Sequence, residues 1–308
     1  MSKLIECVPN FSEGRRPEVI EAIVSSVSRV PGVVLLDQSS DHDHNRTVLT
    51  LAGSPEGLKE AILNLYEAVL KHIDLREHKG EHPRMGAVDV VPFIPVRNAS
   101  MEDCVALAKE VGELVAGKFG VPMFLYAEAA SDPGRKVLAS IRKGEFEGMA
   151  AKMQDAAWKP DFGPAQPHPS AGVSAIGARF FLVAYNLQLD TPDLKVAQAI
   201  AKAVRASSGG LQNVQAMGVF LADRNQAQVS MNLLNYEKTP IHRVQELVKA
   251  EAARYGARVM SAEIVGLIPQ QALLEAASYY LQVENWSPSL VLENAMLEKE
   301  QAHVELVH

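Results

Sequence analysis

Residues 32–53, GVVLLDQSSDHDHNRTVLTLAG, decide the fold because they set two strands next to each other in the chain. Residues 32–37 and 46–53 are rich in valine, leucine and threonine, whereas residues 38–45 between them are polar. Apolar runs of this length with a polar connection are typical of neighbouring β-strands. The stretch therefore predicts two consecutive strands joined by a loop.

Helical patterns stand on both sides of these strands. Residues 16–30 repeat apolar side chains at helical spacing, with Pro17 where a first-turn proline belongs. Residues 54–73 open with Ser-Pro and show the same spacing. A strand before the first helix, a strand after the second, and an added helix and strand complete this half, at residues 4–11, 87–96, 101–119 and 121–129. The core of the first half reads β-α-β-β-α-β.

The same element order recurs after an irregular stretch. Residues 159–179 are rich in proline and glycine without periodicity, and beyond them four strands and two helices follow, with a hairpin around residues 223–225. We therefore predict an α/β (α+β) fold of two subdomains, residues 1–178 and 179–308. Each is expected to be a split β-α-β module with its helices on one face of a mixed sheet, and a cleft is expected between the two. The charged tail, residues 290–308, predicts an amphipathic helix.

Composition limits the classes of function. The 308-residue chain has a net charge of −7 and no dense basic cluster, which disfavours binding to a phosphate backbone. Its longest apolar runs are strand-sized and far too short for a membrane span. Cys7 and Cys104 lie far apart, and the first residues lack a secretory signal core. We expect a cytoplasmic protein without disulfides that binds neither nucleic acid nor membrane.

Residues 78–93, HKGEHPRMGAVDVVPF, concentrate reactive side chains directly before an apolar strand. His78 and His82 have the spacing of a helical zinc pair, but Gly80 and Pro83 discourage a helix and no third ligand is evident, so we expect no metal. An imidazole on a loop anchored by a strand titrates near neutral pH and suits proton transfer. An ordinary polar turn is the other interpretation, and the residues alone leave both open.

Two further stretches need an interpretation. The run DHDHN, residues 41–45, looks like a metal binder, yet it lies at a strand connection where polar residues are expected. The loop at residues 159–179 is harder to explain by packing, because long ordered loops without secondary structure usually bind something. Its prolines favour a rigid surface over a flexible tether.

Several motifs carry a family resemblance. The longest is HKGEHPRMGAVDVVPFIPVR at residues 78–97. The others are ECVPNFSEG at 6–14, NRTV at 45–48, KPDFGP at 159–164, GAR at 177–179, AQVSMNLLN at 227–235 and EIVGLIP at 263–269. Together they resemble the glutamate formimidoyltransferase family, including the formiminotransferase domain of formiminotransferase-cyclodeaminase. The resemblance covers most of the chain, from Met1 to about the helix at Gln270.

The resemblance implies a fold and a reaction. The family has two α/β subdomains with a groove between them, acts as a homodimer, and moves a formimino group between N5 of tetrahydrofolate and the amine of L-glutamate in histidine degradation. Its catalytic histidine falls on His82, and tetrahydrofolate is the co-substrate. Its folate-binding segment falls on Gly163, Pro164, Ala165, Gln166, Pro167, His168, Pro169, Ser170, Ala171 and Gly172.

Formimino transfer requires a group that first accepts and then donates a proton. Because both substrates are anionic, cationic side chains are also expected near them. Further pocket candidates are Asn10, Asp37, Arg46, Lys79, Arg84, Glu128 and Arg179, and Arg15 and Arg16 are candidates for steering. Two alternatives remain: a related folate enzyme that uses 5-formyltetrahydrofolate, and a folate-binding protein without turnover.

Two departures from the family pattern stand out. The cyclodeaminase domain is missing from these 308 residues, so channelling to it within one polypeptide is not expected. Ser39 stands where the family is expected to carry an acid, and Asp37, Asp41 and Asp43 are the candidates to replace that acid.

Overall fold

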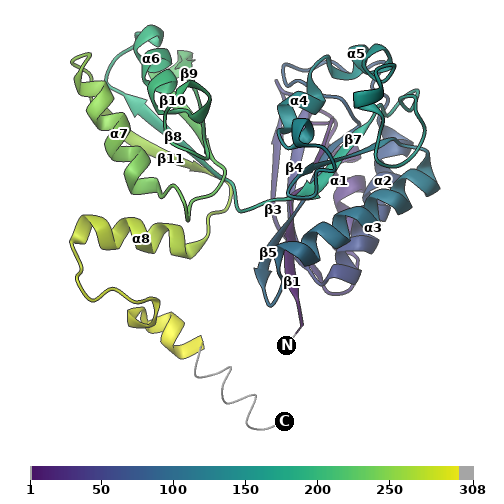
Figure 1. The fold of residues 1–308 in the computed structure, drawn as a ribbon, viewed down its shortest axis with the longest axis horizontal. Coiled ribbons are helices and arrows are strands. Elements are labelled where there is room, and N and C mark those ends of the chain that lie inside the picture. Colours follow the sequence, from purple (N-terminus) through teal and green to yellow (C-terminus); the bar gives the residue numbers. More distant parts are fainter. Residues whose placement is uncertain (1, 298–308) are drawn as a thin grey trace. The chain divides into compact units, whose positions relative to one another are not determined.

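The computed structural model describes residues 2–297. The chain divides between Phe180 and Phe181 into two compact units (Figure 1). Each unit has its own hydrophobic core, and each is described here by itself.

Unit 1 is built on a seven-stranded sheet with β5, β7 and β6 at one edge and β3 at the other. β5 and β6 each pair with β7 in parallel, whereas the remaining pairs are antiparallel, so this sheet is mixed, as predicted. The strands are β1 (Leu4–Cys7), β2 (Asn10–Phe11), β3 (Val33–Asp41), β4 (Arg46–Gly53), β5 (Val88–Arg97), β6 (Met123–Ala127) and β7 (Ser174–Ala178). The order across the sheet is β3, β4, the interrupted strand β1/β2, β5, β7 and β6.

The β3–β4 hairpin is tighter than predicted. β3 continues to Asp41 because its polar second half still pairs with β4, with Asp41 opposite Arg46. The connection is therefore residues 42–45 alone, and the expectation of a loop over 38–45 was wrong. Asn45 closes the turn with φ of 49°, a conformation that asparagine tolerates better than most residues.

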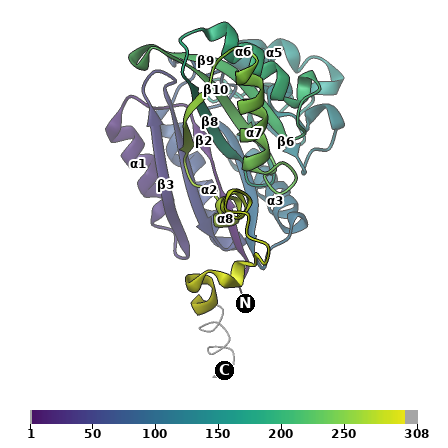
Figure 2. The ribbon, with the colours of Figure 1, turned by 90° about the vertical axis from the view of Figure 1, so that its left-hand side faces the viewer.

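Three helices cover one face of this sheet, α1 (Pro17–Ser28), α2 (Pro55–His72) and α3 (Met101–Phe119). Their apolar stripes form the main core with the strands, and Figure 2 shows α1 beside β3. α2 and α3 begin at capped residues. The Ser54 side chain accepts a hydrogen bond from the Gly57 amide at the start of α2, and Ser100 forms a capping box with Asp103 at the start of α3.

The opposite face is covered in part by two short helices that the sequence did not predict, α4 (Leu138–Arg142) and α5 (Glu145–Lys152). Phe124 and Tyr126 of β6 pack with Ile141 and Met149 from these helices, whereas the alternate β6 residues face the main core. The expectation that all helices lie on one face was therefore wrong for this edge of the sheet. Helices this short leave too few apolar repeats for a periodicity to be read.

Unit 2 has the order β8, α6, β9, β10, α7, β11 and a further helix, α8. Its four-stranded sheet runs β11-β8-β10-β9 and is antiparallel throughout, whereas a mixed sheet was predicted. The bounds are Val183–Leu189, Leu194–Val204, Val214–Leu221, Gln226–Leu233, Ile241–Ala253, Val259–Val265 and Gln270–Leu281.

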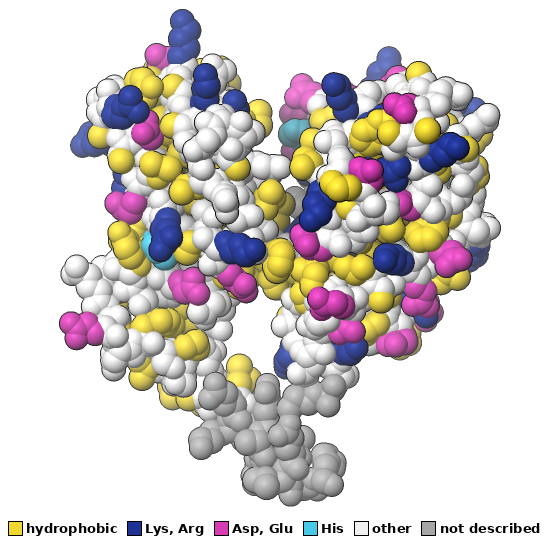
Figure 3. All heavy atoms as spheres, viewed as in Figure 1, with side chains coloured by type: hydrophobic (Ala, Val, Ile, Leu, Met, Phe, Trp, Pro, Cys, Tyr) yellow, Lys and Arg dark blue, Asp and Glu magenta, His cyan; other side chains and the backbone are white. Residues whose placement is uncertain are grey.

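Three features complete the description. No helix within residues 2–297 is long and apolar enough to cross a membrane. On the face shown in Figure 3, positive and negative side chains are interspersed over both units. The predicted tail helix at residues 290–308 falls largely on residues 298–308, which lie outside the described residues.

Candidate functional site

The loop that carries His82 is docked against the tip of the β3–β4 hairpin. Asn45 Nδ2 donates a hydrogen bond to the carbonyl oxygen of Lys79 at 3.0 Å. Gly80 permits this close approach, because a Cβ there would lie 2.3 Å from the carbonyl oxygen of His44. Segments more than thirty residues apart in the chain are thereby joined beside the start of β5.

His78 uses both ring nitrogens to hold this loop. Its Nδ1 accepts from Arg84 Nε at 3.1 Å, so the ring proton is on Nε2, which donates to the carbonyl oxygen of Asn45 at 2.8 Å. Burial lowers the pKa of His78 and favours this neutral form. Arg84 is buried and also pairs with Glu147 at 2.8 Å. His78 and Arg84 are therefore committed to holding the loop and the start of α5.

His82, by contrast, meets a cation. Arg46 Nη1 lies 2.5 Å from His82 Nε2. Because a guanidinium only donates, Nε2 is the acceptor, and the proton of the neutral ring is on Nδ1. The ring of His44 stands edge-on to that of His82, with centroids 6.1 Å apart. The nitrogen that faces Arg46 is thus the basic one.

The surroundings keep the His82 imidazole neutral. Burial lowers the pKa of His82 to about 3, and the positive charges of Arg46 and Arg142 act in the same direction. Asp41, whose carboxylate lies 3.0 Å from His44 Nδ1, opposes them.

Asp41 is one of the three acids considered as replacements for an acid at Ser39. It is the one named among the charges that act on the pKa of His82, which it raises. Asp43 pairs with His42 at the exposed tip, 3.5 Å away. Asp37 lies further along β3, opposite Thr50.

A second guanidinium reaches the same place from α4. Arg142 Nη2 donates to Asp89 Oδ2 at 2.6 Å, and Asp89, only 1% exposed, also accepts from the Met85 amide at 2.8 Å. Arg142 Nε is buried and has no hydrogen-bond partner within the described residues. Burial, followed by the charge of Arg142, lowers the pKa of Arg46. The positive charges of both guanidinium groups therefore act on the neutral His82 imidazole, and Arg46 contacts it directly.

Asp89 and Arg142 were missed by reasoning from the sequence. A lone acid inside the apolar strand at residues 87–96 needs a buried partner, so Asp89 carried a signal that could have been used. Arg142 carried none, because its helix is too short to show a periodicity.

The start of the proposed folate segment, residues 163–172, is held in place by its neighbours. Asp161, just before it, forms a largely buried ion pair with Arg135 at 3.1 Å. Gly163 has φ of +91°, and a Cβ there would lie 3.1 Å from the Ala116 side chain. Residues 163–166 that follow are exposed.

The end of the same segment is tied to the residues that follow the His82 loop. The amide of Ala87 donates to the carbonyl oxygen of Ala171 at 2.9 Å. Gly172 has φ of +68°, and a Cβ there would lie 2.2 Å from the carbonyl oxygen of Met85. The segment is therefore anchored at both ends and accessible between them, as expected of a rigid binding loop.

Asn10, Asp37 and Arg46 lie on the sheet face opposite α1, α2 and α3. The register pairs Asn10 with Val48 and with Val90, and Val90 belongs to the core under α4 and α5. On β4, Arg46 and Thr50 each lie two residues from Val48, and Asp37 of β3 pairs with Thr50. Because side chains alternate between the two faces of a sheet, Arg46 and Asp37 lie on the same face as Val48. The structure brings Arg46 to His82, with Asn10 and Asp37 on the same face.

Glu128 and Arg179 lie at the other end of the strands. They follow the carboxyl ends of β6 and β7, whereas His82 precedes the amino end of β5, which runs parallel to them. Arg179 Nη1 donates to the carbonyl oxygen of Phe180 at 3.0 Å. These two candidates are therefore not part of the His82 cluster.

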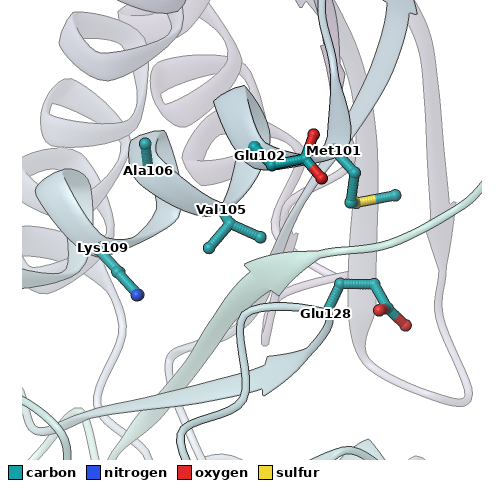
Figure 4. Close-up of a pocket in the computed structure, with 6 residues that line it drawn as sticks. All are labelled: Met101, Glu102, Val105, Ala106, Lys109 and Glu128. Carbon is teal, nitrogen blue, oxygen red and sulfur yellow. The ribbon is translucent and has the colours of Figure 1, made fainter.

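Glu128 lines a hollow of about 490 Å³ at this far end. Figure 4 shows Glu128 across from the side chains of α3 that form the other wall. The lining residues are Met101, Glu102, Val105, Ala106, Lys109 and Glu128. Because this hollow contains no histidine and lies away from His82, we place the candidate catalytic centre at the His82 end of unit 1.

The remaining basic candidates have local roles. Lys79 is exposed and holds Asn45 through its backbone carbonyl. Arg15 Nε donates to the carbonyl oxygen of His42 at 2.8 Å, and Arg16 pairs with Glu13 at 2.5 Å.

Within residues 2–297 no group of three or more histidine, cysteine, aspartate or glutamate side chains could hold a metal ion. Both ring nitrogens of His78 are engaged in hydrogen bonds, and His82 Nε2 accepts from Arg46.

Comparison with known proteins follows the same division of the chain. Residues 4–179 match the model of the formiminotransferase domain, N-terminal subdomain, and residues 184–302 match that of the formiminotransferase domain. Over 298 residues the chain is 47% identical to a glutamate formimidoyltransferase of Streptococcus pyogenes serotype M1, covering 96% of this chain and 100% of that protein.

Two further relatives agree. A glutamate formimidoyltransferase of Thermoplasma acidophilum is 46% identical over 295 residues, covering 95% of this chain and 97% of that protein. The formimidoyltransferase-cyclodeaminase of Rattus norvegicus is 46% identical over 290 residues, covering 92% of this chain but 53% of that protein.

Proposed function

Because the chain belongs to the formiminotransferase family, we propose that it is a glutamate formimidoyltransferase in which His82 moves the proton. It transfers a formimino group between 5-formimidoyltetrahydrofolate and L-glutamate, a step of histidine degradation and one-carbon metabolism. The observation that carries the catalytic assignment is the neutral His82 imidazole, whose Nε2 lone pair faces Arg46.

The residues account for the proton balance. The ammonium of L-glutamate passes one proton to His82 Nε2, and its freed lone pair attacks the amidine carbon of the donor. The bond from that carbon to folate N5 then breaks, and N5 takes the proton from His82. A second ammonium proton ends on the formimino nitrogen, so the product is a cationic amidine and the total charge is unchanged. One histidine suffices because it acts first as base and then as acid.

The loop at residues 163–172 holds the folate. Its anchored ends and exposed middle support this role, and its end is hydrogen-bonded next to the His82 loop through Ala87. Tetrahydrofolate is the co-substrate, and the reaction needs no metal. Arg46 and Asn10 belong to the same site. Asp41 supplies the negative charge near His82 that the uncharged Ser39 does not provide.

The proposal includes three finer features. Each unit derives from a split β-α-β module, the protein acts as a homodimer, and it works in the cytoplasm. The element order β-α-β-β-α-β in both units supports the first of these.

The test supplies purified protein with 5-formimidoyltetrahydrofolate and L-glutamate and measures N-formimidoylglutamate and free tetrahydrofolate. We expect both products in equal amounts, and only when both substrates are present. Preferred turnover of 5-formyltetrahydrofolate would identify a different folate enzyme, and folate binding without any turnover would identify a binding protein. A chelator added to the reaction should leave the rate unchanged.

A further inference from the structure

We propose that Arg46 and Arg142 together bind the α-carboxylate of the amino-acid acceptor, and that this binding frees His82 Nε2 to receive the proton of the neighbouring amine. The inference rests on the proposed function and assigns the acceptor subsite within it.

The charges around His82 call for an anion. Arg46 is partly buried, and no carboxylate lies within 4.0 Å of its guanidinium in the described part of the chain. Arg142 is paired with Asp89 through Nη2 only, and its side chain is 16% exposed. Of the two guanidiniums, only that of Arg142 is thus directly paired with a carboxylate, that of Asp89. Since partly buried charge is unfavourable without a counterion, the site is completed by a bound anion.

The form of the site suits a carboxylate. Arg46 lies on β4 and contacts His82, and Arg142, at the end of α4, pairs with Asp89 at the start of β5. Asn10 pairs with Val48 of β4 and with Val90 of β5, so these two stretches lie on either side of it in the sheet, and the charge of Arg142 acts on both Arg46 and His82. Arg142 Nε is a buried donor that nothing in residues 2–297 satisfies. Guanidinium groups bind carboxylates through paired N–H donors, which a substrate carboxylate would satisfy at both arginines.

The contact between Arg46 and His82 selects the α-carboxylate over the γ-carboxylate. Arg46 Nη1 occupies His82 Nε2, the nitrogen that must accept the proton. A carboxylate attracts this guanidinium more strongly than a neutral imidazole does, so binding draws the donor away from Nε2. The α-carboxylate shares its carbon with the reactive amine, and anchoring it beside His82 sets that amine next to the freed nitrogen. The γ-carboxylate would hold the amine several bonds away.

The test compares the wild-type protein with Arg142→Gln and with the control Arg29→Gln. Arg29 is exposed and directly follows α1, a helix that covers the sheet face opposite the site. We expect Arg142→Gln to raise the KM for L-glutamate by about 10- to 100-fold, the size expected for lost hydrogen bonds to a charged group. The KM for 5-formimidoyltetrahydrofolate should stay within about twofold, and the control should behave as wild type.

Modified acceptors identify which carboxylate is bound. Isoglutamine carries an amide in place of the α-carboxylate, and L-glutamine carries one in place of the γ-carboxylate. The wild-type preference in kcat/KM for L-glutamate over isoglutamine should shrink in Arg142→Gln, while the preference over L-glutamine should not change. The double variant Asp89→Asn/Arg142→Gln repeats the measurement without leaving a buried carboxylate unpaired, in case the single variant does not fold.

Three results overturn the inference: an unchanged KM for L-glutamate in a folded variant, a rise in the folate KM instead, or a loss of discrimination against L-glutamine. The second result would assign the two arginines to the carboxylates of the folate tail. Absence of turnover in the wild-type protein would instead contradict the proposed function, so the two failures are distinguishable.

Discussion

His82 combines two properties that its neighbours impose on it: a neutral ring and an occupied Nε2. A base with a pKa of about 3 is weak, so the state with Arg46 on Nε2 is a resting state. Burial is the main cause of the lowered pKa of His82, and the charges of Arg46 and Arg142 add to it. A substrate carboxylate that neutralises these guanidiniums removes the second cause and raises the pKa, so we expect His82 to be a stronger base with the acceptor bound than without it.

The lowered pKa of His82 predicts a dependence of stability on pH. Unfolding returns His82 to its ordinary value of about 6.5, so between pH 6.5 and about 3 the unfolded chain binds a proton that the folded protein does not. This contribution to stability is complete above pH 6.5 and is lost as the pH falls toward 3. We expect His82→Gln to remove it, so that the free energy of unfolding of the variant falls less steeply over this range.

The measurement is urea unfolding at several pH values between 7 and 4 for wild type, His82→Gln and the control His42→Gln. His42 has a side chain that is 76% exposed and lies at the hairpin tip. Equal slopes for wild type and His82→Gln would show that the imidazole is not held neutral by its surroundings.

Helices with a clear apolar periodicity were predicted well, whereas elements that depend on strand pairing or on contacts with distant residues were not. The helices α1, α2 and α3 follow from their apolar spacing and caps. The second half of β3 is polar and becomes strand only because β4 lies beside it, so local sequence could not reveal it. α4 and α5 are short, and a glycine with φ of +97°, Gly144, separates them. Because α4 was not predicted, Arg142, which lies on it, was not predicted as a site residue either.

The resemblance and the physical argument covered different parts of the candidate site. His82 and the segment at residues 163–172 came from sequence motifs, and Arg46 was named only as a pocket candidate. That Arg46 contacts His82, and that Asp89 fixes Arg142 beside them, depends on the pairing of distant strands and loops. Spacing along the chain cannot give such contacts.

The anchoring of the folate segment gives a prediction at the element scale. Gly172→Ala places a side chain 2.2 Å from the carbonyl oxygen of Met85 and strains a φ of +68°. We expect the free energy of unfolding to fall by about 1–3 kcal/mol or more, and the folate KM to rise, because the end of the segment must move. Calorimetry and steady-state kinetics measure the two effects.

Gly148→Ala is the matched control for that substitution. Gly148 lies in α5, and apart from its chain neighbours and the backbone of its own helix no atom of residues 2–297 lies within 4 Å of the position of its Cβ. Alanine there should stabilise the helix by about 0.5–1 kcal/mol and leave the folate KM unchanged. Similar effects of the two substitutions would mean that the segment is not fixed through Gly172.

For the whole molecule, family and geometry converge on one reaction. Both units match formiminotransferase domain models, and relatives of nearly the same length are glutamate formimidoyltransferases. Within unit 1, the hairpin tip, the His82 loop, α4 and the folate segment meet around the amino ends of β5 and β7. In the proposed reaction, His82 carries the proton between the two substrates.

The most direct measurement of that claim is the rate of N-formimidoylglutamate formation from 5-formimidoyltetrahydrofolate and L-glutamate by the wild-type protein, His82→Ala and the control His42→Ala. We predict that His82→Ala lowers kcat by about 10²- to 10⁴-fold, the usual contribution of general acid–base catalysis, while folate binding by titration is retained. His42→Ala should keep the wild-type rate. A His82→Ala protein that turns over at the wild-type rate would contradict the account.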